Sequence, residues 1–443
     1  MQKIKSFIDK IKKFKYWTAV GCSLAAAFVV IIVLIFITIS MSDDSNENKT
    51  LEAENLTSVI TTTEIQTTTE EDTPETTVEI ITETTTVETT TPEETTQVQV
   101  ETTTTQNIVL DGDYSYIQPI QPTDGVATLV FVGDVNIGDK IENYYNQNGL
   151  DGFLSTNLQN TFLNSDVFAL NHEYVSSDAG DEHKVDYELW YYKNPTRRQV
   201  ILNAMGVDVV TLANNHTLDY GEEGLVDTMN ALNQVGVSYV GVGHNLNEAK
   251  SAYIKEINGK KIAILASNRV VPRVDWYAND TKLGQMTTYE GTDRYQMILS
   301  EISRLKNEEG CDLVVVMVHW GENEVQDIQQ YQINVGHGYI DAGADVVIGS
   351  HTHTLQGAEI YNGKYIFYGV SNFLFENYRV DSSAIHISMA ADNSLLIKLI
   401  PCVSQNYIVT DVSGNEAKRI FLQIESLSPN ISIDDNGIVK LRN

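Results

Sequence analysis

Short apolar runs alternate with amphipathic stretches over residues 108–443. Strands are predicted at 127–132, 166–170, 208–213, 238–242, 312–318 and 345–348, helices at 197–205, 221–234, 295–309 and 328–342, and hairpins with Asn-Gly-Lys turns at 252–266 and 358–368. Strands that alternate with helices of about 10–15 residues are typical of layered α/β proteins. The two hairpins add antiparallel pairs. The pattern therefore predicts an α/β domain with a mixed sheet.

Polar residues follow several of the apolar runs, at the point where each run ends. These residues are Asp134, Glu173, Asn215, His319 and His351. In open α/β sheets, ligands bind outside the carboxyl ends of the strands. We therefore expect these side chains to gather at one edge of the sheet and to form a shared polar site.

The N-terminal segment has the pattern of a membrane anchor. Residues 1–16 contain six lysines and one acid, and residues 17–41 contain no charged residue. About 20 apolar residues in a helix span the ~30 Å core of a bilayer. A signal peptide is the alternative, but its apolar core is usually shorter, about 7–15 residues. The lysines predict a cytoplasmic N-terminus and an extracellular C-terminal domain in a single-pass cell-membrane protein.

Residues 42–107 differ from the rest of the chain, since they consist mainly of Thr and Glu and contain sixteen acids and one lysine. Low hydrophobicity combined with charge of one sign predicts a disordered stalk. The remaining residues, 108–443, carry a net charge of about −21. An acidic domain is a poor candidate for nucleic-acid binding, but acidic surfaces attract metal cations. Cys311 and Cys402 allow one disulfide.

The side chains at the predicted strand ends combine imidazole with carboxylate. His351 and His353 stand two residues apart after one strand, and His319 follows another. Together with Asp134 and Glu173 they suit Zn, Mn, Fe or Ni better than calcium, which prefers oxygen ligands. Each residue also has an ordinary structural explanation: an aspartate after glycine often forms a turn, and a buried histidine often only satisfies hydrogen bonds. Their shared position at strand ends favours a metal site.

Several motifs make the chain resemble the CapA-type capsule-synthesis family, which is associated with bacterial poly-γ-glutamate. The resemblance covers residues 126–378, and the motifs are Gly133-Asp134-Val135-Asn136, Asn171-His172-Glu173, the block from Leu212 to Gly221 that contains Asn214-Asn215-His216, His319-Trp320-Gly321-Glu322, Gly349-Ser350-His351-Thr352-His353 and Tyr368-Gly369-Val370-Ser371-Asn372-Phe373. That family in turn resembles calcineurin-type metallophosphoesterases. The resemblance implies a four-layer α/β/β/α fold with a site for two divalent metal ions, which we expect to be Mn, Zn or Fe.

The resemblance also implies roles for individual residues. Asp134 and His353 would bind the first metal, and Glu173 would bridge both ions. The second metal would be bound by Asn215, His319 and His351. His216 would be the acid beside the leaving group, oriented by Asp219. Metal pairs of this kind bind a phosphoryl or carboxyl group.

The chain departs from the phosphoesterase pattern at two ligand positions. Asn136 stands where those enzymes place a histidine, and Glu173 stands where they use aspartate. Asparagine is a weak neutral ligand, so the first metal site would be loose. Glu322 has no counterpart, and it is interpreted as a partner that fixes the His319 tautomer, as an acid on the substrate side, or as a solvated loop carboxylate.

Three functions follow from these predictions. The first is a membrane-anchored protein of poly-γ-glutamate capsule biosynthesis or export, with the synthesis machinery and an anionic polymer as partners. The second is a metal-dependent phosphoesterase or hydrolase at the cell surface. The third is a non-catalytic polymer-binding module that has lost its metals.

Overall fold

The computed structural model describes residues 125–180, 184–185, 192–375 and 379–442. The predicted basic tail, transmembrane helix and stalk, residues 1–107, lie outside the described residues. Among the helices that are described, none combines the length and the apolar character needed to cross a bilayer. The described residues all belong to one compact unit, Val109–Asn443.

The larger sheet has eight strands. Its order is β18-β17-β16-β1-β2-β5-β6, with β15 also paired to β1. The neighbours β1, β2, β5 and β6 run parallel, and the pairs β1–β16, β16–β17 and β17–β18 are antiparallel. The strands are β1 (Gly125–Val135), β2 (Val167–His172), β5 (Val209–Thr211), β6 (Ser238–Val240), β15 (Asn372–Leu374), β16 (Val380–Ala390), β17 (Leu395–Gln405) and β18 (Ile408–Asp411).

The second sheet has six strands in the order β13-β14-β12-β11-β9-β8. Its centre, β9–β11–β12–β14, is parallel, and hairpins form both edges. Asn258 and Asn362, with their following glycines, have positive φ, as the predicted two-residue turns require. The strands are β8 (Tyr253–Ile257), β9 (Lys260–Asn268), β11 (Leu313–His319), β12 (Val346–Ser350), β13 (Ala358–Tyr361) and β14 (Lys364–Phe367).

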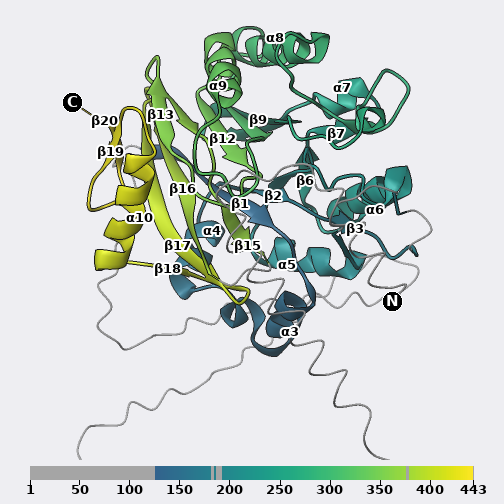
Figure 1. Cartoon of the computed structure of the whole chain (residues 1–443), viewed down its shortest axis with the longest axis horizontal. Coiled ribbons are helices and arrows are strands. Elements are labelled where there is room, and N and C mark those ends of the chain that lie inside the picture. Colours follow the sequence, from purple (N-terminus) through teal and green to yellow (C-terminus); the bar gives the residue numbers. More distant parts are fainter. Residues whose placement is uncertain (1–124, 181–183, 186–191, 376–378, 443) are drawn as a thin grey trace, which may run out of the picture. The chain divides into compact units, whose positions relative to one another are not determined.

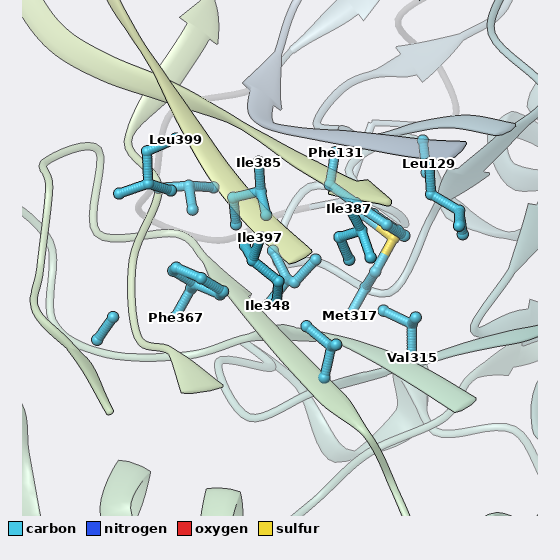
Figure 2. Packing of buried hydrophobic residues seen from close by; sticks show 14 of the residues in the cluster. Leu129, Phe131, Val315, Met317, Ile348, Phe367, Ile385, Ile387, Ile397 and Leu399 are labelled. Carbon is cyan, nitrogen blue, oxygen red and sulfur yellow. The ribbon is translucent and has the colours of Figure 1, made fainter. Parts of the chain in front are cut away.

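The two sheets pack face to face across one hydrophobic cluster. Figure 2 shows Leu129 and Phe131 of β1 on one side of it, and Val315 and Met317 of β11 on the other. Alternate residues of the same strands belong to two outer clusters, as a period of two requires. The predicted α/β architecture with mixed sheets is confirmed.

Helices cover the outer face of each sheet (Figure 1). Helices α4 (Thr156–Leu163), α5 (Gln199–Ala204) and α6 (Gly221–Gln234) supply buried side chains to the cluster outside the larger sheet. Helices α8 (Asp293–Asn307) and α9 (Gln330–Ala342) do the same for the smaller sheet. Helix α10 (Gly414–Ser426) instead closes the inter-sheet cluster beside β17. The chain therefore folds as two facing sheets between layers of helices.

Three local details differ from the sequence predictions. The helix predicted at 197–205 begins as a 3₁₀ turn, Thr196–Arg198, and continues as α5. Strands β16, β17 and β18 and helix α10 were not among the predicted elements. Cys311 and Cys402 are both buried and free, so the disulfide that their number allowed is not formed.

Candidate metal centre

The predicted ligands come from the strand ends of both sheets. Asp134 is the penultimate residue of β1, and Glu173 directly follows β2 in the larger sheet. In the smaller sheet, His319 ends β11, and His351 directly follows β12. Because the sheets face each other, the carboxylates approach from one sheet and the imidazoles from the other.

Two groups of side chains have the spacing needed to hold a metal ion. Asp134, Glu173 and His353 form one, and Glu173, His319 and His351 form the other; in each group the ligand atoms lie within 4.8 Å of one another. The Glu173 Oε1 atom lies 3.8 Å from His319 Nε2 and 3.7 Å from His353 Nε2. Glu173 is thus shared by the two groups.

Asn215, the amide predicted as a ligand, lies beside the second group. Its Oδ1 atom is 2.6 Å from His319 Nε2. The opposite ring nitrogen, His319 Nδ1, lies 3.0 Å from Ser350 Oγ. If Nε2 binds a metal, Nδ1 carries the proton and donates it to the Ser350 hydroxyl, which fixes the tautomer.

The loop after β12 curls so that its two histidines converge. His351 and His353 both have positive φ, 95° and 54°. Such conformations cost on the order of 1–3 kcal/mol each for a residue with a Cβ, and they cluster at functional sites. The strand before the loop must also approach closely, since a Cβ on Gly349 would lie 2.1 Å from the Tyr368 carbonyl oxygen. The surrounding structure therefore holds this loop in a strained shape.

Asn171 connects the carboxylates of the two groups. Its Nδ2 atom donates to Asp134 Oδ1 at 2.7 Å and to Glu173 Oε2 at 3.2 Å, and it lies 3.4 Å from His319 Nδ1. Asn214 Nδ2 in turn donates to Asn171 Oδ1 at 3.1 Å. This buried chain of amides fixes the positions of the carboxylates without neutralising either of them.

The two carboxylates have opposite pKa shifts. Burial raises the pKa of Glu173 well above its usual value, and the neighbouring Asp134 raises it further. Burial also acts to raise the pKa of Asp134, but the contact with His353 and the hydrogen bond from Asn171 outweigh it and leave this pKa lowered. The pair therefore holds one negative charge more readily than two.

Burial also separates the histidines. It lowers the pKa of His319 well below its usual value and the pKa of His351 to about 3, in both cases with help from neighbouring histidines. For His353 the effect of burial is outweighed by Asp134, which raises the pKa. His319 and His351 are therefore neutral at physiological pH, which is the form that binds metals.

The residues present fit a divalent metal. Glu173 Oε1 and His351 Nδ1 are buried polar atoms without a hydrogen-bond partner among the described residues. Such atoms are costly in a protein interior unless something binds them. Both belong to the group of Glu173, His319 and His351, and a cation would satisfy both. Imidazole and carboxylate ligands together suit Zn, Mn or Fe.

A cavity of about 940 Å³ opens over the centre, and His216 lines it together with Asn215, His351 and His353. His216 Nδ1 lies 2.8 Å from Asp219 Oδ2. Asp219 is fully buried and also accepts a hydrogen bond from the Tyr192 backbone N–H at 2.9 Å. The predicted pairing of His216 with a carboxylate is therefore present in the structure.

Comparisons with known proteins agree with the motifs. Residues 128–377 match the family model described as "Bacterial capsule synthesis protein PGA_cap". The chain belongs to this family. It is 28% identical over 327 residues to "Capsule biosynthesis protein CapA" of Bacillus anthracis, covering 69% of this chain and 77% of that protein. It is 31% identical over 255 residues to "PGA biosynthesis protein CapA" of Bacillus subtilis (strain 168), covering 57% and 64%.

One solved structure is also similar, the crystal structure of the protein TT1561 of Thermus thermophilus. It has a TM-score of 0.35 and 9% sequence identity, and the match covers 62% of this chain and 99% of that chain. A likeness this weak supports no conclusion about function.

Two predicted site residues lie apart from the groups. Asn136 Oδ1 accepts a hydrogen bond from Asn194 Nδ2 at 2.7 Å, so the oxygen that would bind a metal is already used. Glu322 is exposed, and Ser350, not Glu322, contacts His319 Nδ1. The first of the three interpretations of Glu322 is therefore wrong. Its interpretation as an acid on the substrate side stays a prediction.

The sequence analysis assigned no role to three residues that support the site. Asn171 and Ser350 are adjacent in sequence to predicted ligands or lie two residues away, and Asn372 Oδ1 lies 2.6 Å from His353 Nδ1. All three occur within the motifs of the family. Their position there was the available signal, but sequence alone does not say which neighbour an amide or hydroxyl contacts.

Proposed function

We propose that this chain acts in poly-γ-glutamate capsule synthesis at the bacterial cell surface and that it does so with a divalent metal centre. Membership of the capsule-synthesis family supports the pathway. The observation that carries the metal centre is Glu173, whose buried Oε1 atom is shared by two groups of ligands and has no hydrogen-bond partner among the described residues.

The proposal assigns ligands as follows. One ion would be held by Asp134, Glu173 and His353, and a second by Glu173, Asn215, His319 and His351. A bound divalent cation would supply positive charge that stabilises negative charge on a ligand in the cavity. The facing sheets between helix layers support a fold of the metallophosphoesterase type, with the two-metal site that such a fold implies.

A second candidate function is a metal-dependent hydrolase, a phosphoesterase among them. The observation that favours it is the pair of His216 and Asp219, because His216 lines the cavity beside the centre. When Nδ1 donates to Asp219, a proton on Nε2 is available to a leaving group, and the buried carboxylate stabilises the imidazolium. A module that only binds polymer would have no use for this pair.

The proposal also includes the anchor. Residues 17–41 would hold the protein in the cell membrane with the N-terminus in the cytoplasm, and the domain would meet the synthesis machinery and its anionic polymer outside. Protease added to intact cells should remove the domain and leave a small membrane-bound fragment. A mature chain that begins near Ser42 would contradict the anchor and indicate a cleaved signal peptide.

The metal centre is tested by element analysis of the full-length protein purified without chelator. Changing His319 or His351 to alanine removes a direct ligand, so the metal affinity should fall at least 10–100-fold. His337→Ala is the matched control, because His337 pairs with Glu359 away from the centre. Equal metal content in all four folded proteins would refute the metal centre.

The hydrolase candidate is tested with His216→Ala. This variant should keep the full metal content, because His216 belongs to neither group. If the protein is a hydrolase, the variant should lose hydrolysis of a phosphate ester and also capsule production in cells that lack their own copy. Normal capsule production by this variant would reject the hydrolase candidate and leave the metal-dependent capsule function in place.

A further inference from the structure

Arg269 lies at the edge of the candidate metal centre and has no role in the proposal above. It directly follows β9, whose last residue, Asn268, is in register with His319 of the neighbouring strand. The Arg269 backbone N–H donates to the His319 carbonyl oxygen at 2.8 Å. The side chain lines the same cavity of about 940 Å³ as His216, His351 and His353. Its position is therefore tied to the centre by the backbone.

Two tyrosine rings fix the guanidinium group. The Arg269 Cζ atom lies 4.1 Å from the centroid of the Tyr289 ring and 4.7 Å from that of the Tyr331 ring. The Tyr331 hydroxyl accepts a hydrogen bond from the Gly321 backbone N–H, which holds that ring in place. Stacking on aromatic rings leaves the N–H edges of a guanidinium available for hydrogen bonds.

Arg269 has no acidic partner among the described residues, and its buried Nε atom has no hydrogen-bond partner there. The other lining arginine, Arg379, pairs with Asp381 and Glu416. Arg273, four residues further along the chain, pairs with Asp275 through two contacts of 2.9 Å. In a chain with a net charge of −31, acids are in excess. An unpaired, half-buried guanidinium facing a cavity therefore points to an anionic ligand.

The walls of the cavity suit a ligand of several groups. Apolar and aromatic side chains, among them Pro272 and Phe375, line it together with the amides of Asn215 and Asn372. Glu324 also lines it, so negative charge is not uniformly favoured there. An oxyanion is therefore expected beside Arg269, while the rest of the ligand contacts the remaining wall.

We propose that Arg269 is an oxyanion-binding residue of this cavity. Its guanidinium binds a carboxylate or phosphate through paired hydrogen bonds, and it thereby orients a ligand toward the candidate metal centre. The orientation toward metal rests on the proposed function, whereas the binding of the oxyanion does not. Carboxylate and phosphate share this chemistry, since both accept two parallel N–H donors.

The proposal is tested by titration calorimetry with the full-length protein, with metal and after chelation. The probes are a γ-linked triglutamate, the same peptide with its α-carboxylates amidated, and inorganic phosphate. Arg269→Gln should weaken triglutamate binding about 10–100-fold, because a charge-assisted pair is lost. Arg273→Gln is the matched control and should change it by less than about twofold, as expected for an exposed pair. The amidated peptide should bind weakly to all three proteins.

The outcomes separate the sources and the two proposals. A loss confined to phosphate would identify phosphate as the ligand group, and a loss confined to triglutamate would identify carboxylate. Equal affinities of wild type and Arg269→Gln for both probes, or no binding of either probe by wild type, would overturn the proposal. If the wild type contains no metal but Arg269→Gln still weakens binding, only the metal centre fails. Should Arg269→Gln not fold, Arg269→Lys provides the test, with a loss of severalfold expected because lysine cannot donate bidentately.

Discussion

The two sheets contribute to the candidate centre in different ways. The larger sheet supplies oxygen ligands, Asp134 and Glu173, which a buried amide chain through Asn171 holds in place. The smaller sheet supplies imidazoles, and two of them lie on a loop with positive φ. The oxygen side is thus positioned by hydrogen bonds, and the histidine side is positioned by backbone strain.

This difference has a physical consequence. A carboxylate pair in a buried site needs compensation for its charge, and Asn171 provides only dipoles. The neutral histidines need no such compensation, but they leave His351 Nδ1 without a partner among the described residues. Each side is incomplete alone, and a cation between the two sheets would satisfy both.

The largest expected effect concerns the residue shared by the two groups. Glu173→Gln removes the anionic oxygen from both of them, so metal should fall to background, a loss of well over 100-fold in affinity. Asp134→Asn affects one group only and should keep at least one ion per chain. Element analysis and metal titration measure both variants. A full metal complement in Glu173→Gln would show that the two sheets do not share a ligand.

The next prediction uses His386 of β16, a buried histidine outside the centre. Burial, with Lys398 nearby, lowers its pKa from the usual 6.5 to about 4. As the pH falls, the unfolded chain takes up this proton first, so the free energy of unfolding should fall between pH 6.5 and about 4. The loss is about 3 kcal/mol, at about 1.4 kcal/mol per pH unit.

His386→Gln should lack this part of the acid destabilisation. Urea unfolding at pH 7 and pH 4.5 measures it as the change, between the two pH values, in the difference between wild type and variant. A difference that is independent of pH would show that His386 is protonated in the folded protein. The result would also separate ordinary histidine burial from the behaviour of the histidines in the centre.

A smaller effect compares the supports of the two sides. Asn171→Leu removes contacts to Asp134, Glu173 and His319, and metal affinity should fall by close to 100-fold; Ser350→Ala removes only the contact to His319 and should cost about tenfold. Metal titration of both variants gives the ratio. A greater loss in Ser350→Ala would mean that the histidine side, not the oxygen side, depends more on hydrogen bonds.

The smallest effect is expected for Glu322, which is exposed. Glu322→Gln should change metal affinity by less than about twofold and stability by less than about 0.5 kcal/mol, as is usual for surface substitutions. Capsule production in cells that carry this variant checks the remaining alternative. Loss of capsule with normal metal content would show that Glu322 acts on the substrate side.

Much of the fold and of the centre could be predicted from the sequence, because the signals are local. The end of a strand is set by a change from apolar to polar residues, and the Asn-Gly turns need positive φ that only a few residue types adopt easily. Asp134, Glu173, Asn215, His319, His351 and His353 were placed at strand ends in this way. The pairing of His216 with Asp219, three residues apart, follows from short-range geometry combined with the family resemblance.

Other features depended on contacts between distant segments, which no local pattern specifies. Which side chains meet across the two sheets decides that Glu173 serves both groups and that Asn136 bonds to Asn194 instead of a metal. The same packing places Arg269 between two tyrosines from other parts of the chain. The sequence therefore determined which chemical groups stand at the strand ends, and only the tertiary structure decided which of them act together, because facing sheets join residues far apart in the chain.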